Sequence, residues 1–224
     1  MPHRWPEVRN LGQIKVSRTD PGDTPTMDAA TVPAPASPGP ATAPPGDLAI
    51  WFFILAELLA FGVFFAAYAF ARAHNVALFD TMQQTLDRQA GALNTVLLIS
   101  GSACVARAVE AVGRARSATG ARWLLAGIAC GAGFLVVKGV EYAAKFEAGI
   151  NLSTNTFYMF YLSLTFFHFM HVILGMVILV ALWVKTRQGA YGPADMNGIE
   201  SGAAYWHMVD LVWIVLFPLV YVMR

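Results

Sequence analysis

Five long apolar segments constrain the fold of this chain more than any other feature of its sequence. Short polar connections separate them. A helix needs about 20 residues to cross the ~30 Å hydrocarbon core of a bilayer, and each segment is long enough. We therefore expect an all-α polytopic membrane protein, built as a bundle of five transmembrane helices. The segments cover residues 48–71, 92–112, 122–144, 154–184 and 203–223.

The composition agrees with a membrane location and excludes other classes of protein. Charged residues make up 13% of the chain, whereas they make up about 25% of a soluble domain. The formal net charge of +1 provides no electrostatic basis for binding nucleic acid. Cys104 and Cys130 lie within apolar segments, which favours packing roles over a disulfide bond or a metal site.

Residues 1–46 differ from the rest of the chain. The stretch from Pro21 to Pro45 is rich in proline, interleaved with Ala, Thr, Gly and Asp. Such a segment buries too little apolar surface to offset the entropy that is lost on ordering. We expect a disordered tail over residues 1–46, without the apolar core of a secretory signal, followed by a transmembrane domain over residues 47–224.

The distribution of Lys and Arg indicates how the chain is oriented. Basic residues concentrate in the tail and in two connections, around Arg114 and Arg116 and around Lys185 and Arg187. Cytoplasmic loops carry the excess of such residues. We expect a multi-pass protein of a bacterial-type inner (plasma) membrane, with its N-terminus in the cytoplasm and its C-terminus outside.

Several ionisable residues interrupt the apolar segments, where each costs about 3 kcal/mol on insertion scales. Each of them therefore needs a polar partner, and together they are the candidate site residues. Three pairs are spaced i, i+3, which places both side chains of a pair on one helix face. The pairs are His168 with His171, His207 with Asp210, and, toward the outer side of the third segment, the secondary pair Lys138 with Glu141.

Glu57 stands alone in the first apolar segment. It shares a helix face with Phe61, Phe64 and Tyr68, so its carboxyl group is predicted to face an aromatic, packed surface. A neutral acid in such a place can hydrogen-bond to another helix. We interpret Glu57 as a polar clasp between helices, within one intramembrane polar cluster. The predicted members of this cluster are Glu57, His168, His171, His207 and Asp210.

Other roles for these residues stay open at this point. His168 and His171 are spaced as two histidines that share a metal ion, although no Glu-x-x-His motif or cysteine cluster accompanies them. A haem held between His207 and one of these histidines is a second alternative, and a proton relay through Glu57 is a third. The sequence contains no nucleophile elbow, phosphate loop or paired carboxylate site, so independent catalysis has no support.

Two features predict how the helices pack. Gly127 and Gly131, four residues apart in the third segment, allow a neighbouring helix to approach closely. Pro218 in the last segment removes a backbone donor and is expected to kink that helix.

Five blocks of sequence carry a resemblance to a known family. They are "WFFILAELLAFGVFF" (51–65), "LNTVLLISG" (93–101), "KGVEY" (138–142), "TFFHFMHVILG" (165–175) and "E…YWHMVDLVWIVLF" (200–217). With these blocks in family order, residues 47–224 resemble subunit III of the haem–copper oxidase superfamily, the cytochrome c oxidase subunit 3 type.

The resemblance implies a non-catalytic third subunit or accessory protein that stabilises the catalytic subunit of a respiratory complex and supports proton uptake nearby. It implies that this chain binds no cofactor of its own, that haem and metal lie in the partner subunit, and that membrane phospholipid is a candidate ligand. In the family, the acid at the position of Glu57 hydrogen-bonds to histidine in the later helices. Here His168, His171 and His207 occupy the matching motifs.

The chain also departs from the family pattern. Mitochondrial-type members have seven spans, and the first two are replaced here by the tail, which puts lipid binding in doubt. Phe166 and Met208 stand where the family often has glycine and phenylalanine. The opening block over residues 47–72 is most similar to five-span accessory proteins of nitric oxide reductase, which makes that enzyme an alternative partner. An independent proton or small-solute transporter and a haem-bearing membrane cytochrome are the rival hypotheses.

Overall fold

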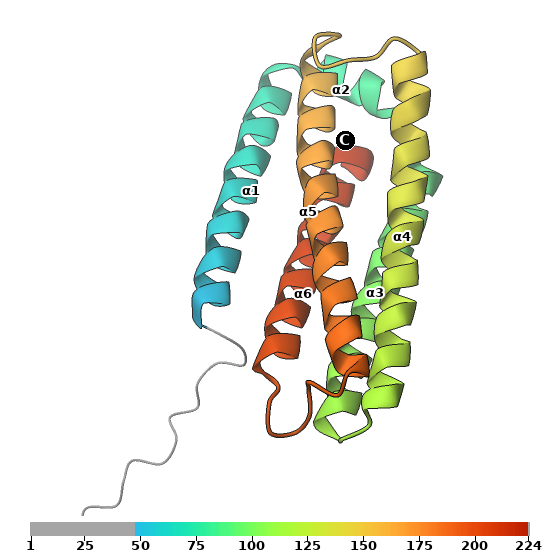
Figure 1. Ribbon diagram of the computed structural model, residues 1–224. Coiled ribbons are helices and arrows are strands. Elements are labelled where there is room, and N and C mark those ends of the chain that lie inside the picture. Colours follow the sequence, from blue (N-terminus) through green and yellow to red (C-terminus); the bar gives the residue numbers. More distant parts are fainter. Residues whose placement is uncertain (1–47, 224) are drawn as a thin grey trace, which may run out of the picture. The chain divides into compact units, whose positions relative to one another are not determined.

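A computed structural model describes residues 48–223, and the predictions for the tail of residues 1–46 lie outside this range. Within it, five helices are long and apolar enough to cross a membrane, and no β-strand accompanies them, which confirms the all-α fold class. Figure 1 shows them as a bundle in which α1 begins at the lower end. They are α1 (Leu48–His74), α3 (Arg88–Gly113), α4 (Ser117–Glu147), α5 (Thr156–Arg187) and α6 (Asn197–Phe217).

Most of these helices extend beyond the apolar segments at one end or both, and polar side chains cap the starts of α3 and α5. The Asp87 carboxylate accepts hydrogen bonds from the backbone N–H groups of Gln89 and Ala90, so α3 begins before its apolar stretch. The Asn155 side chain accepts from the N–H of Tyr158 at the start of α5. Side-chain oxygens at these positions satisfy amide groups that lack partners within the helix.

A short helix, α2 (Val76–Gln83), lies in the connection between the first two spans, where the sequence did not predict one. Its Gln83 side chain is fully buried and donates a hydrogen bond of 2.9 Å to the carbonyl oxygen of Val220. Its Asp80 forms an ion pair of 2.8 Å with Arg72 of α1. Arg72 also donates to the carbonyl oxygen of Met223. These contacts join the ends of α1, α2 and the last span.

The last span changes helix type at Pro218. Proline has no amide hydrogen to donate, and α6 passes there into a π-helical turn, η1 (Pro218–Val222). The predicted kink therefore takes the form of a wider helical turn. The carbonyl oxygen of Val220 in this turn is the group that accepts from Gln83.

α6 is the centre of the bundle and contacts α1, α3 and α5. Its most apolar stretch is 56% buried, whereas that of α1 is 11% buried. The Trp206 indole of α6 lies against two glycines: a Cβ atom on Gly131 would come within 2.8 Å of its ring, and one on Gly175 within 2.9 Å. A Cβ atom on Gly127 would lie 3.1 Å from the Val105 side chain. The predicted packing role of Gly127 and Gly131 is confirmed.

Candidate functional site

Glu57 of α1 and His171 of α5 form a polar contact between two helices. Glu57 Oε2 lies 3.0 Å from His171 Nε2. The other ring nitrogen, Nδ1, lies 2.7 Å from the carbonyl oxygen of Phe167. A carbonyl oxygen only accepts, so Nδ1 carries a hydrogen and one further proton is shared between Nε2 and the carboxyl group. Either a neutral Glu57 donates to a neutral imidazole, or an imidazolium donates to the carboxylate.

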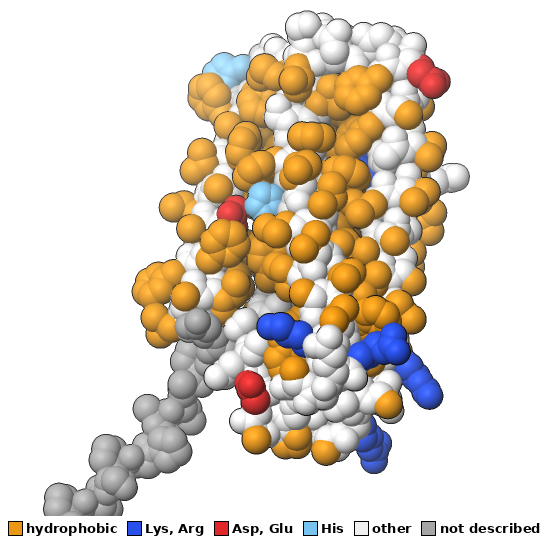
Figure 2. Space-filling model, in the orientation of Figure 1, with side chains coloured by type: hydrophobic (Ala, Val, Ile, Leu, Met, Phe, Trp, Pro, Cys, Tyr) orange, Lys and Arg blue, Asp and Glu red, His pale blue; other side chains and the backbone are white. Residues whose placement is uncertain are grey.

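This pair is only partly covered by the bundle. The side chains of Glu57 and His171 are 21% and 11% exposed, respectively. The rings of Phe61 and Phe167 pack edge-on against the His171 ring, with centroids 5.2 and 4.6 Å away. Figure 2 shows that hydrophobic side chains cover most of this face of the bundle, over α1 and α5. The pair is thus an isolated polar contact in an apolar surface.

His168, one turn before His171, is not a partner of Glu57. It is completely buried, and neither ring nitrogen has a hydrogen-bond partner within residues 48–223. The aromatic rings of Phe61, Phe134 and Trp213 surround it at centroid distances of 5.2 to 6.3 Å. His168 therefore belongs to the aromatic core between α1, α4, α5 and α6.

His207 and Asp210 of α6 lie in a third environment. His207 Nδ1 is 2.5 Å from Ser102 Oγ, a contact that joins α6 to α3. No hydrogen bond joins His207 to Asp210 in the part of the chain that the structure describes, and Asp210 Oδ1 is buried without a partner there. The local pairing predicted for these two residues is therefore wrong, because the hydroxyl group of a neighbouring helix takes the imidazole.

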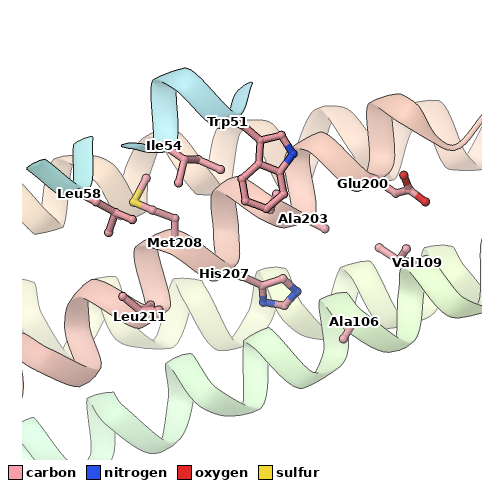
Figure 3. Close-up of a pocket in the computed structure, with 11 residues that line it drawn as sticks. Trp51, Ile54, Leu58, Ala106, Val109, Glu200, Ala203, His207, Met208 and Leu211 are labelled. Atoms are coloured by element: carbon pink, nitrogen blue, oxygen red, sulfur yellow. The ribbon is translucent and has the colours of Figure 1, made fainter. Parts of the chain in front are cut away.

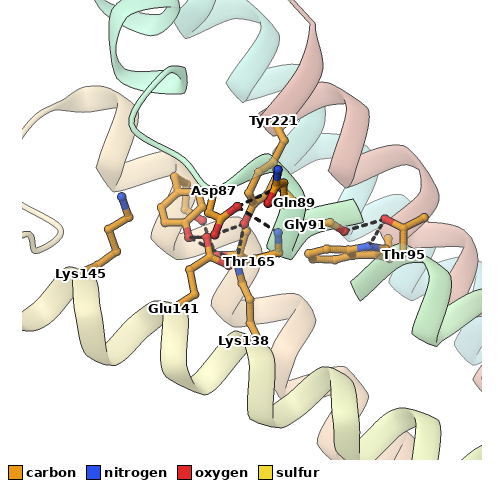
Figure 4. Close-up of polar contacts among 12 residues, drawn as sticks. Asp87, Gln89, Gly91, Thr95, Lys138, Glu141, Lys145, Thr165 and Tyr221 are labelled. Carbon is orange, nitrogen blue, oxygen red and sulfur yellow. Dashed lines mark hydrogen bonds and ion pairs between the residues drawn. The ribbon is translucent and has the colours of Figure 1, made fainter. Parts of the chain in front are cut away.

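Lys138 and Glu141 of α4 do pair as predicted, with 3.0 Å between Lys138 Nζ and Glu141 Oε2. Tyr161 of α5 and Tyr221 of η1 donate to Glu141 Oε1 over 2.6 and 2.9 Å, and Lys138 donates to the Tyr221 hydroxyl over 2.5 Å. Figure 4 shows Lys138, Glu141 and Tyr221 converging in this network. Lys138 is fully buried and lies 5.0 to 5.8 Å from the centroids of four aromatic rings.

The predicted cluster of five residues is therefore divided among three environments. Glu57 with His171 is a clasp between helices, His168 lies in the aromatic core, and His207 contacts α3. Sequence reasoning missed Ser102, Tyr161 and Tyr221 as partners. Tyr161 and Tyr221 each place a hydroxyl group in an apolar segment, and this was the signal by which the sequence could have indicated them. Among residues 48–223, no three His, Cys, Asp or Glu side chains gather closely enough to hold a metal ion.

Comparisons with known proteins agree on one family. The family model "Cytochrome c oxidase subunit III" matches residues 46–224, which include every residue that the structure describes. A "Cytochrome c oxidase subunit 3" of Synechocystis sp. is 32% identical over 172 residues, 76% of this chain and 72% of that protein. Another, of Thermostichus vulcanus, is 31% identical over 177 residues, 79% of this chain and 86% of that protein. A "Heme-copper oxidase subunit I+III" of Aeropyrum pernix is 31% identical over 179 residues, 77% of this chain and 22% of that protein.

Proposed function

Because the chain belongs to the cytochrome c oxidase subunit III family, the non-catalytic third subunits of haem–copper oxidases in respiratory electron transport, we propose that it stabilises the catalytic subunit of such a complex in the membrane. The family match over all described residues carries this proposal. The five spans support it, since they provide the membrane-embedded surface that such a subunit needs. The relative from Aeropyrum pernix, named subunit I+III, unites both kinds of subunit in its name.

The redox groups of the complex belong to the partner, the catalytic subunit. Haem and metal lie in the catalytic subunit, and this chain contributes contacts rather than ligands. His168 is enclosed by aromatic rings, and His207 Nδ1 is taken by Ser102. Membrane phospholipid is the other expected contact of the exposed apolar faces.

Glu57 is proposed to hold α1 to the rest of the bundle. α1 is the least buried span, so its position depends on a few specific contacts. The Glu57–His171 pair provides one near the middle of α1, and the Arg72–Asp80 pair provides another at its upper end. A polar contact within the membrane fixes the relative position of two helices, because lipid offers no alternative partner.

The sequence also suggested another partner enzyme and a proton relay. The relatives described above are named as cytochrome c oxidase or haem–copper oxidase subunits, and an association with nitric oxide reductase stays a prediction from the opening block. A proton relay receives less support, because the polar groups lie in separate environments and the buried His168 has no hydrogen-bond partner in residues 48–223. The cytoplasmic position of the N-terminus also stays a prediction.

Purification of the tagged chain from its native membrane in mild detergent tests the proposal. We expect a haem-containing catalytic subunit to co-purify, identified by mass spectrometry and by its visible spectrum. A chain that purifies alone with a haem band of its own would support the cytochrome hypothesis. A chain that moves protons or solute in vesicles without any partner would support the transporter hypothesis. Either result would contradict the proposed function.

A further inference from the structure

A groove runs along α6 in the lower half of the bundle, on the side where α1 and α3 flank that helix (Figure 3). Its volume is about 580 Å³. Residues of α6 form the floor, Ile54 and Leu58 of α1 form one wall, and Ala106 of α3 belongs to the other. The floor residues Glu200, Ala204, His207 and Leu211 recur along one face of α6. The groove is therefore an elongated surface parallel to a transmembrane helix.

Two ionisable side chains line this groove: His207 lies within the last apolar segment, and Glu200 lies in the first turn of α6, just before that segment. His207 uses Nδ1 for Ser102, and its Nε2 has no hydrogen-bond partner within residues 48–223. Glu200, at the end of the groove near the start of α6, has no cationic partner in the same range. Polar groups at membrane depth are stable only when another polar group satisfies them, and an acyl chain offers none. At His207, an occupant with a polar side chain satisfies the free ring nitrogen better than an acyl chain does.

The spacing of the floor residues indicates the shape of that occupant. Positions 200, 204, 207 and 211 follow the i, i+4, i+7, i+11 repeat with which one helix presents a seam to another. Ala204 on the floor and Ala106 on the wall are small, and small residues let two helix backbones approach closely in a membrane. An occupant that is both helical and partly polar fits the groove better than lipid does.

We propose that this groove receives a transmembrane helix of the catalytic subunit, with a hydrogen-bonding side chain opposite His207 and a basic side chain opposite Glu200. The inference rests on the proposed function, to which it adds the face of the bundle that the partner contacts. Charge complementarity at Glu200 and hydrogen bonding at His207 set the position of the partner helix along α6. The apolar residues of the groove supply most of the contact area.

Site-specific photo-crosslinking in the native membrane tests the position of the partner. A photoreactive phenylalanine derivative replaces Leu211 in the groove or, as a control, Val177 of α5, which is exposed outside the groove. We expect the Leu211 derivative to crosslink to a haem-containing catalytic subunit and the Val177 derivative to crosslink to lipid only. Crosslinks from Leu211 to lipid alone, or to a second copy of this chain, would overturn the inference.

Filling the groove provides a second test that leaves the core intact. Ala106 is exposed on α3, so Ala106→Phe adds a ring to the groove wall without disturbing the interior. Overfilling a packed contact lowers recovery of the catalytic subunit by about tenfold. Ala129→Phe, at an exposed position of α4 outside the groove, is the matched control and should leave recovery unchanged. Equal recovery with both variants would contradict the inference.

These tests separate the inference from the proposed function. If the catalytic subunit co-purifies with the wild-type chain but crosslinks only from Val177, the proposed function stands and the groove is the wrong face. If no haem-containing subunit co-purifies with the wild-type chain, the proposed function itself is wrong, and the inference fails with it.

Discussion

Two polar pairs within the bundle, Lys138–Glu141 and Glu57–His171, differ in how completely the protein encloses them. Lys138 and Glu141 are buried at 0% and 6% side-chain exposure, and two tyrosine hydroxyl groups satisfy the remaining positions around the carboxylate. Glu57 and His171 are more exposed and share a single contact. An enclosed network can only hold helices together, whereas a pair at the surface can also respond to a neighbouring molecule. The first region is therefore structural, and the second joins the least buried span to the bundle.

Removal of the cation from the enclosed network should have the largest effect. Lys138→Met leaves the Glu141 carboxylate buried without a counter-ion, which costs about 3–5 kcal/mol. Denaturant unfolding in detergent, followed by tryptophan fluorescence, measures this loss. The double variant Lys138→Met with Glu141→Gln should recover part of it, because no charge is then buried alone. Lys145→Met, at the partly exposed end of α4, is the control. If the single variant Lys138→Met is as stable as the wild type, the network has no structural role.

Removal of the acid from the surface pair should have a smaller effect on stability. Glu57→Leu leaves His171 Nε2 without a partner, at a cost of about 1–3 kcal/mol, whereas the amide of Glu57→Gln still forms a hydrogen bond. We expect the leucine variant to release α1 and to reduce recovery of the catalytic subunit, and the glutamine variant to retain most of both. Thermal unfolding and co-purification measure the two effects. Assembly of the leucine variant at the wild-type level would show that the clasp is dispensable.

The contact between Ser102 and His207 should show the smallest effect, because it is one neutral hydrogen bond between helices. Ser102→Ala should cost about 0.6 kcal/mol, the average for such contacts in membrane proteins. Ser100→Ala, at an exposed position of the same helix, is the control for helix propensity. If Ser102→Ala lowers the free energy of unfolding as much as Lys138→Met does, this contact contributes to stability like the enclosed network and not like the surface pair.

Much of the fold follows from local pattern alone. The five spans were predictable because a transmembrane helix is recognised by its length and by its average hydropathy over some twenty residues. The Lys138–Glu141 pair was predictable because an i, i+3 spacing brings its members together on any helix. α2 was missed because its eight residues are too short and too polar to show either signal.

The contacts between helices were less predictable. The sequence indicated that Glu57 needs an imidazole, and His171 provides one. It did not distinguish His171 from His168, because two residues of one turn differ only in rotation about the helix axis, which the packing of neighbouring helices decides. The sequence did not indicate Ser102, since its role as a partner of His207 depends on how α3 and α6 align.

The central position of α6 has a consequence for biosynthesis. α6 is the last of the five spans to leave the ribosome, yet it is the helix around which α1, α3 and α5 are arranged. α1 must therefore stay in the lipid until translation of the other four is nearly finished, and its largely apolar surface, interrupted near the middle by Glu57, lets it do so as a separate helix. The finished arrangement is reached only when α6, the last span to be inserted, packs between helices that are already in the membrane.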